Sequence, residues 1–159
     1  MNSLRLAALL SVSLGLLACP ARKIPGTEID DTDDARAVLN TMEAYRKGVE
    51  KRDAEAITRL VDESFKDDGG NTDPGDNLVY KDLPGKLKER FDKLDDVRLE
   101  MTVRRLEMDK DDQTARATYT FTITWRLPGL TNRTQRESDV KQMILRRHEK
   151  NEWRIVSGI

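Results

Sequence analysis

The acidic loop between residues 67 and 76 holds the densest set of side chains that could bind a metal ion. Its sequence, DDGGNTDPGD, offers the side-chain oxygens of Asp67, Asp68, Asn71, Asp73 and Asp76. Oxygen ligands of this type are those that Ca²⁺ prefers. The loop lacks the EF-hand order, because it has no glycine at the sixth position and no glutamate at the twelfth. Acidic loops rich in Gly and Pro are also common as plain turns, so both interpretations stay open and we predict no metal cofactor.

His148 is the only histidine of the chain and lies in the segment RRHEK, near the end of a predicted strand. A metal site built from His and Cys needs several such ligands, whereas this chain has one of each. A Ser-His-Asp arrangement would have to use His148, and no nucleophile-elbow motif accompanies any serine. We therefore expect His148 to be a surface residue.

The N-terminal segment combines an apolar run with the single cysteine. One basic residue, Arg5, precedes an apolar stretch that ends in LLAC at Cys19. A charged start, an apolar centre and small residues at the exit are typical of a secretory signal peptide. The run is too short for a mature transmembrane helix, which needs about 20 apolar residues. Its end resembles the lipobox of bacterial lipoproteins, which implies a signal peptide over residues 1–18 and acylation of Cys19 by fatty acids such as palmitate. The alternatives are an ordinary secreted protein with a free cysteine and a buried N-terminal helix.

Acylation of Cys19 would anchor the chain to a membrane of the cell envelope, in the inner or the outer leaflet. One cysteine cannot form an intramolecular disulfide, and several acyl chains anchor a protein firmly. Residues 19–32 hold two prolines, a glycine and an acidic cluster, so we expect a flexible spacer there. Residues 33–159 fit a single domain.

The charge balance gives no reason to propose nucleic acid as a partner. The chain has 28 basic and 29 acidic residues and a net charge of −1, whereas nucleic-acid-binding proteins carry an excess of positive charge. Acidic residues gather in residues 62–82 and basic ones in residues 126–154. We interpret these as solvated surfaces of opposite sign, and a polarised binding face is the alternative.

Three helices are predicted in the first half of the domain. Apolar residues at intervals of three and four predict one helix with a single apolar stripe, formed by Ala35, Val38, Leu39, Met42, Tyr45 and Val49. Asp53 is placed to cap a second, short helix. The segment DLPGKLKERFDKL predicts a third, capped by Asp82, with Leu87, Phe91 and Leu94 on one face.

Beyond Asp95 the apolar period falls from 3.6 to 2, which predicts strands. The alternation changes phase at Arg104-Arg105, as a β-bulge would cause. Residues 115–125 then alternate strictly, with apolar residues on one face and mainly threonine on the other. SDVKQMILRRHE and EWRIVSGI supply two further strands. Three helices followed by four antiparallel strands predict an α+β fold in which helices cover one face of a curved sheet.

This element order, with the signatures EKRDAEAITRLVDESF and NEWRIVSGI, resembles the NTF2-like superfamily, and its SnoaL-like and DUF4440-type domains in particular. The resemblance covers residues 33–159 and implies a cone between the sheet and the helices. In the enzymes of this superfamily the chemistry takes place in that cone, with a carboxylate base and tyrosine or acid donors. The same fold serves transport factors and non-catalytic accessory domains, so it does not fix an activity.

On this resemblance, seven aromatic side chains are candidates to line a pocket in the cone: Tyr45, Tyr80, Phe91, Tyr119, Phe121, Trp125 and Trp153. The tyrosines, with Asp76 and Asp82 nearby in sequence, do not reproduce a catalytic pattern of the superfamily, so we predict no catalytic residue and no cofactor. The hypothesis is an envelope lipoprotein that binds a small apolar ligand or an envelope protein without catalysis. The alternative is a SnoaL-like isomerase, dehydratase or hydrolase-type enzyme acting in the cone.

The outer face of the predicted sheet bears on the oligomeric state. NTF2-like domains often dimerise by laying sheet on sheet. Here that face presents threonine and arginine, such as Arg116, Thr118 and Thr120, whereas obligate dimer interfaces are more hydrophobic. We expect a monomer or at most a weak dimer.

Overall fold

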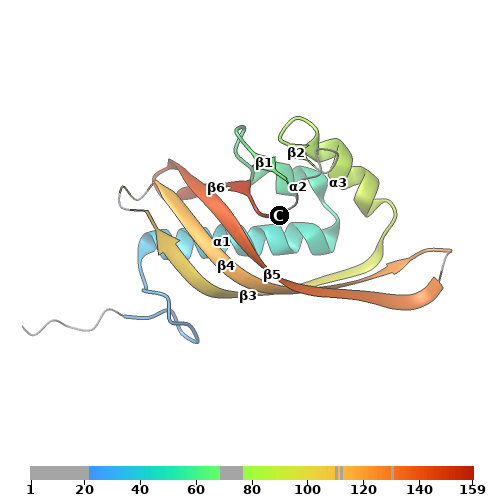
Figure 1. The fold of residues 1–159 in the computed structure, drawn as a ribbon, viewed down its shortest axis with the longest axis horizontal. Coiled ribbons are helices and arrows are strands. Elements are labelled where there is room, and N and C mark those ends of the chain that lie inside the picture. Colours follow the sequence, from blue (N-terminus) through green and yellow to red (C-terminus); the bar gives the residue numbers. More distant parts are fainter. Residues whose placement is uncertain (1–21, 69–76, 110, 112, 130) are drawn as a thin grey trace, which may run out of the picture.

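Helices pack against one face of a long, curved antiparallel sheet (Figure 1). The computed structural model describes residues 22–68, 77–109, 111, 113–129 and 131–159. The elements are α1 (Asp33–Lys51), α2 (Ala54–Arg59), β1 (Lys66–Asp67), β2 (Leu78–Val79), α3 (Leu83–Phe91), β3 (Asp95–Met108), β4 (Thr114–Leu127), β5 (Thr131–Glu149) and β6 (Glu152–Ser157). The α+β order of helices followed by four antiparallel strands is the one predicted. The structure adds a small sheet of β1 and β2, whose strands lie at the two ends of the predicted loop.

The N-terminal boundary of each of the first two helices follows from a capping side chain. Thr32 caps α1, because its hydroxyl accepts a hydrogen bond of 3.1 Å from the Ala35 N–H. Asp53 caps α2 as predicted, with 2.8 Å between its carboxylate and the Ala56 N–H. The two helices approach closely at Gly48, where a Cβ atom would lie 2.7 Å from the Ile57 side chain. A larger residue at position 48 would therefore push α2 away from α1.

The main sheet has the strand order β3-β4-β5-β6. The predicted bulge is present, since the register between β3 and β4 shifts between Val103 and Arg105. Register places Leu99, Ile123 and Glu137 side by side on the face toward the helices. The core between the sheet and the helices includes the fully buried side chains of Trp153, Ile57, Leu83, Met143, Leu145 and Ile155.

At each edge of the main sheet, one described peptide group is hydrogen-bonded to another part of the chain. At the β3 edge, the Leu99 N–H donates to the Glu50 carboxylate at 3.1 Å, and Arg46 donates to the Leu99 carbonyl at 3.4 Å. At the β6 edge, the Ile155 N–H donates to the Leu60 carbonyl and its carbonyl accepts from the Asp62 N–H, each at 2.9 Å. Side chains of α1 thus engage the Leu99 peptide group at one edge, and the segment after α2 pairs with Ile155 at the other.

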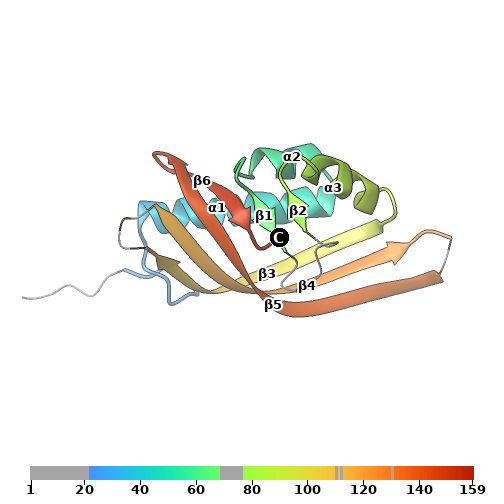
Figure 2. The same cartoon turned by 45° about the horizontal axis from the view of Figure 1, so that its top comes forward.

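The far ends of β4 and β5 extend past the helices, as Figures 1 and 2 both show. At the opposite end of the molecule, residues 23–30, predicted as part of the spacer, form a tight turn in which Lys23 and Asp30 pair as an antiparallel bridge. Cys19 and the predicted signal peptide lie outside the described residues. Across the described ranges, no helix has the length and apolar character needed to span a membrane.

Candidate functional site

A cavity of about 230 Å³ lies between the helices and the inner face of the main sheet. Helices α1 and α3 form one wall, and strands β3, β4 and β5 form the other. Its lining residues are Tyr45, Val49, Arg90, Phe91, Leu94, Leu99, Met101, Tyr119, Phe121, Ile123, Trp125, Glu137, Lys141 and Ile159. We call this space the cone cavity.

The floor of the cone cavity is apolar because strictly alternating residues of β4 face it. Phe121, Ile123 and Trp125 lie at successive inward positions of β4 and stay half-buried. Leu99 and Met101 of β3 stand directly opposite two of them, Leu99 beside Ile123 and Met101 beside Phe121. Half-buried aromatic and aliphatic side chains around a hollow are typical of a binding site for an apolar molecule.

Charged side chains stand at the mouth of the cone cavity. Arg90 comes from α3, while Glu137 and Lys141 occupy inward positions of β5, opposite Ile123 and Tyr119. The Lys141 ammonium lies 5.5 Å from the centre of the Phe121 ring and 3.3 Å from the main-chain oxygen of Ile159. Within the described part of the chain, Arg90 and Glu137 have no ion-pair partner. The mouth therefore presents two positive charges and one negative charge above an apolar floor.

Two tyrosine hydroxyls lie near one another in the cavity wall. Burial raises the pKa of Tyr45 to about 12, although the positive charge of Arg90 acts in the opposite direction. Burial also raises the pKa of Tyr119, whose hydroxyl donates a 2.9 Å hydrogen bond to the Gly158 carbonyl. Both hydroxyls thus stay protonated at neutral pH, and that of Tyr119 is already committed to the main chain.

The segment 157–159 closes one side of the cone cavity and is held by Asp67. The Asp67 carboxylate accepts from the Gly158 N–H at 2.7 Å and from the Ile159 N–H at 3.1 Å. Gly158 has φ +90°, and a Cβ atom there would overlap the main-chain oxygen of Gln142. A glycine is therefore required for Ile159 to reach the cavity wall.

The structure brings five of the seven predicted pocket residues to the cone cavity: Tyr45, Phe91, Tyr119, Phe121 and Trp125. Tyr80 follows β2 and packs at the margin of the core, where its N–H donates to the Phe65 carbonyl at 3.3 Å. Trp153 is 2% exposed and lies in the core, with the Arg147 guanidinium 4.7 Å from its ring centre. Neither Tyr80 nor Trp153 lines the cone cavity.

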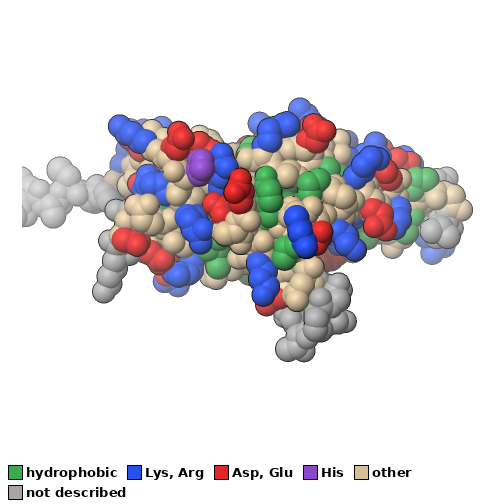
Figure 3. Space-filling view, turned by 90° about the horizontal axis from the view of Figure 1, so that it is seen from above, with side chains coloured by type: hydrophobic (Ala, Val, Ile, Leu, Met, Phe, Trp, Pro, Cys, Tyr) green, Lys and Arg blue, Asp and Glu red, His purple; other side chains and the backbone are tan. Residues whose placement is uncertain are grey.

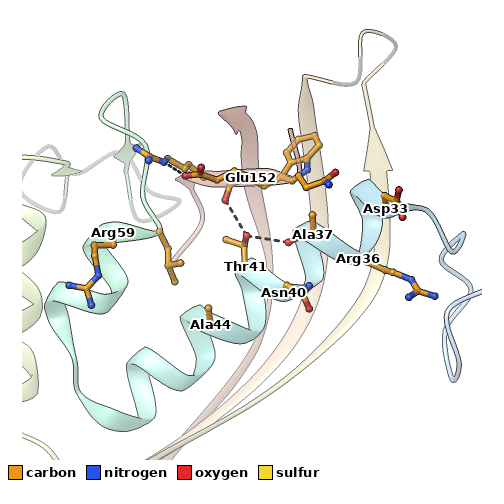
Figure 4. Close-up of a pocket in the computed structure, with 12 residues that line it drawn as sticks. Asp33, Arg36, Ala37, Asn40, Thr41, Ala44, Arg59 and Glu152 are labelled. Carbon is orange, nitrogen blue, oxygen red and sulfur yellow. Dashed lines mark hydrogen bonds and ion pairs between the residues drawn. The ribbon is translucent and has the colours of Figure 1, made fainter. Parts of the chain in front are cut away.

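Trp153 instead borders a second hollow, of about 520 Å³, between α1, α2 and β6. Figure 4 shows Thr41 of α1 reaching toward β6, where its hydroxyl donates to the Trp153 carbonyl at 3.1 Å. Small side chains such as Ala37 and Ala44 alternate there with charged ones such as Arg59 and Glu152. This hollow is more open to solvent and less apolar than the cone cavity, so the cone cavity is the better candidate for a ligand.

Sequence reasoning missed the charged residues of the site. Arg90 precedes the predicted pocket residue Phe91 and was not singled out. Glu137 and Lys141 lie on β5, which begins at Thr131 rather than at the predicted Ser138. The sequence did contain a signal for Glu137 and Lys141. Both are an even number of residues from the buried Met143 and Leu145, so a strand places all four side chains on the same face.

The other predicted sites fall outside the cone cavity. Of the acidic loop, Asp67 and Asp68 are described, while Asn71, Asp73 and Asp76 lie outside the described residues. Asp82 directly precedes α3, but its side chain makes no capping hydrogen bond, so the predicted cap of this helix is wrong. His148 is exposed near the end of β5, as predicted for a surface residue.

Comparison with solved structures shows an NTF2-like fold. A conserved protein from Planctomyces limnophilus aligns with a TM-score of 0.67 at 11% identity, over 79% of this chain and 92% of that one. An NTF2-like superfamily protein from Salmonella enterica gives 0.65 at 12% identity, over 77% and 86%. A type 2 hexachlorocyclohexane dehydrochlorinase gives 0.63 at 12% identity, over 78% and 81%.

In sequence, no family model matches this chain, and no curated protein matches it significantly. The structural alignments establish a shared fold, and at these low identities the activity must be argued from the site. The chain therefore has the NTF2-like architecture that its element order predicted, with a small aromatic cavity inside the cone.

Proposed function

We propose that this protein is a membrane-tethered binding protein whose cone cavity holds a small apolar molecule with an acidic group, without transforming it. The observation that carries the proposal is the pairing of an aromatic floor with Arg90 and Lys141 at the mouth. The tether would be the acylated Cys19. An enzyme acting in the same cavity is the alternative.

The size of the cavity limits the ligand. Pockets for drug-sized ligands usually measure about 300–1,000 Å³, and the cone cavity measures about 230 Å³. A single ring or a short branched chain suits this volume. Contact with Phe121 and Trp125 would supply most of the affinity, because burial of apolar surface is the main favourable term in such sites.

The charges at the mouth select the polar end of the ligand. Arginine binds carboxylates through two parallel hydrogen bonds, and lysine adds a compact positive charge. A carboxylate between Arg90 and Lys141 would leave the apolar body of the ligand on the floor. Glu137, farther along β5, would repel a second negative charge, so we expect a mono-acid.

The described residues of the cavity favour binding over catalysis. The hydroxyl of Tyr119 is engaged by Gly158, and the carboxylate of Asp67 by two main-chain N–H groups. Glu137 is the one carboxylate of the described lining, and it is exposed, whereas carboxylate bases usually act from sites closed to water.

A binding assay on the detergent-solubilised full chain tests this proposal. Trp125 lines the cavity, so its fluorescence should report an aromatic carboxylate, with the primary amide of the same acid as the uncharged comparison. We expect the acid to bind more tightly than the amide. Arg90→Gln and Lys141→Gln should each weaken the acid at least tenfold and change the amide little.

The control for this assay is Lys88→Gln, which removes one positive charge from α3 at a side chain that is 73% exposed and outside the cavity. It should leave both affinities unchanged. Equal affinity for acid and amide would refute the charged mouth, and failure of both to bind would refute the binding function. If the wild-type protein converts the ligand chemically and the Glu137→Gln variant does not, the enzyme alternative is established instead.

A further inference from the structure

A histidine and two glutamates meet at the hairpin between β5 and β6. This hairpin lies at the C-terminal end of β5, and the β4–β5 hairpin lies at its N-terminal end. His148 and Glu149 belong to the end of β5, and Glu152 begins β6. One ring nitrogen of the histidine and one oxygen of each carboxylate lie within 4.8 Å of one another. Figure 3 shows the histidine, in purple, at the surface among acidic and basic side chains.

The backbone of the hairpin explains why these side chains converge. Glu149 and Glu152 are direct cross-strand partners. Neighbouring residues of a regular strand face opposite sides of the sheet, which would separate His148 from Glu149. The register shifts between Arg147 and Glu149, and such a bulge breaks the alternation and re-aims a side chain. The irregularity therefore brings the imidazole to the carboxylates.

One of the two carboxylates in the cluster has no positively charged partner among the described residues. Two carboxylates directly opposite each other on a hairpin repel. Glu152 accepts a 3.0 Å hydrogen bond from Arg154, which offsets one of the two charges. The side chains of His148 and Glu149 have no hydrogen bond or ion pair among the described residues. A nitrogen ligand and a carboxylate thus remain available to a cation.

We propose that His148, Glu149 and Glu152 form a surface site for a divalent transition-metal ion, with Zn²⁺ as the ion of best fit. Zinc binds imidazole nitrogen and carboxylate oxygen at about 2.0–2.2 Å, and sites with three protein ligands keep a water in the fourth position. Small side-chain rotations on the exposed hairpin would close the present spacing to this geometry. Calcium is disfavoured, because it takes six to eight oxygen ligands.

A bound ion would link the two strands across their turn. Glu149 and Glu152 flank the turn residues Lys150 and Asn151, and one ion shared by both carboxylates would turn their repulsion into attraction. The site is remote from the cone cavity, so it does not depend on the ligand proposed there. Its role would be to fix the β5–β6 hairpin.

Titration of the tag-free, metal-stripped full chain with ZnCl₂ tests the site. His148 is the only histidine, so its imidazole NMR signals are unambiguous and should shift on zinc addition. Calorimetry should give one zinc ion per chain. His148→Ala and Glu149→Gln should each weaken binding at least tenfold, whereas Glu55→Gln, which removes an 89% exposed carboxylate of α2, should not.

Three results would overturn the site: no heat and no histidine shift on zinc addition, zinc binding of equal strength in His148→Ala, or CaCl₂ displacing the zinc at equal concentration. If calcium binds but does not shift the histidine signals, it binds to other ligands, such as the acidic loop. The zinc titration then still decides whether the proposed site exists. Because all three side chains lie at the surface, each variant should keep the melting temperature of the metal-free protein, which separates lost ligation from lost folding.

Discussion

Replacement of Gly158 by alanine tests how the segment 157–159 is held against the sheet. At φ +90° an alanine is strained by about 1–2 kcal/mol. Its Cβ atom would overlap the Gln142 oxygen and lie 2.8 Å from the Met143 Cα atom. Both are backbone atoms of β5, which cannot turn aside as a flexible side chain would, so the segment must move away.

That movement breaks three hydrogen bonds. The hydrogen bond from Tyr119 to the Gly158 carbonyl contributes about 1 kcal/mol. The two hydrogen bonds to the Asp67 carboxylate contribute about 1.5–3 kcal/mol each, and water regains part of this when it hydrates the freed groups. With hydration of the freed groups, we expect Gly158→Ala to lower the free energy of unfolding by about 3–6 kcal/mol. It should also weaken ligand binding, because Ile159 leaves the cavity wall.

Urea denaturation followed by circular dichroism measures this loss. Gly129→Ala is the matched control, because Gly129 has a similar φ of +77° but open space around its Cβ position. It should lose only the strain of about 1–2 kcal/mol. If the two variants unfold within about 1 kcal/mol of each other, a difference typical of surface substitutions, the hydrogen bonds assigned to Gly158 do not hold the segment.

Cys19→Ser should leave the domain folded and release it from membranes, and retention of the variant in the membrane fraction at high salt would contradict the lipid anchor. Trp153→Ala should cost about 3–5 kcal/mol, and a melting temperature within a degree or two of wild type would contradict its place in the core. The hydrogen bond from Arg46 lowers the pKa of Glu43 from 4.5 to about 2. Their ion pair therefore stabilises the fold above pH 4.5 and is lost toward pH 2. Because Glu43 is 45% exposed, Glu43→Gln should cost at most about 1 kcal/mol at pH 7 in urea titrations and clearly less at pH 2. Light scattering of a soluble fragment that starts near Ala21 should give a monomer at micromolar concentration, and a dimer that survives dilution would contradict the polar outer face.

The sequence predicted the fold wherever a local pattern had one structural solution. The stripe from Ala35 to Val49 could be buried only as a helix along the sheet, and Asp53 could cap only the helix that follows it. The change of phase at Arg104-Arg105 required a bulge if the apolar residues on both sides were to face the core. These features depend on neighbours in sequence.

The site was predicted less completely because it depends on distances along the sheet. Both tryptophans among the predicted pocket residues, Trp125 and Trp153, lie between the sheet and the helices. The resemblance and the alternation do not tell which end of the cone a residue reaches. Trp153 lies in the closed end and Trp125 at the cavity. Glu137 and Lys141 resembled a solvated surface because charges on a strand usually face water. The cavity keeps that part of the inner face open, so they face inward without being buried.

The hydrogen bonds made at the two edges of the main sheet bear on how copies of the chain behave when they are crowded. An open edge strand is a template on which another chain can add a strand, and this is a common route to aggregation. Arg46 and Glu50 occupy the peptide group of Leu99 on one edge, and the segment after α2 pairs with Ile155 on the other. Molecules held on a membrane by the proposed lipid anchor would meet one another far more often than in free solution. Under such conditions, a mutation that frees the Leu99 N–H, such as Glu50→Ala, would add an open hydrogen-bond donor to the β3 edge, so its effect on aggregation would be larger at the membrane than in dilute solution.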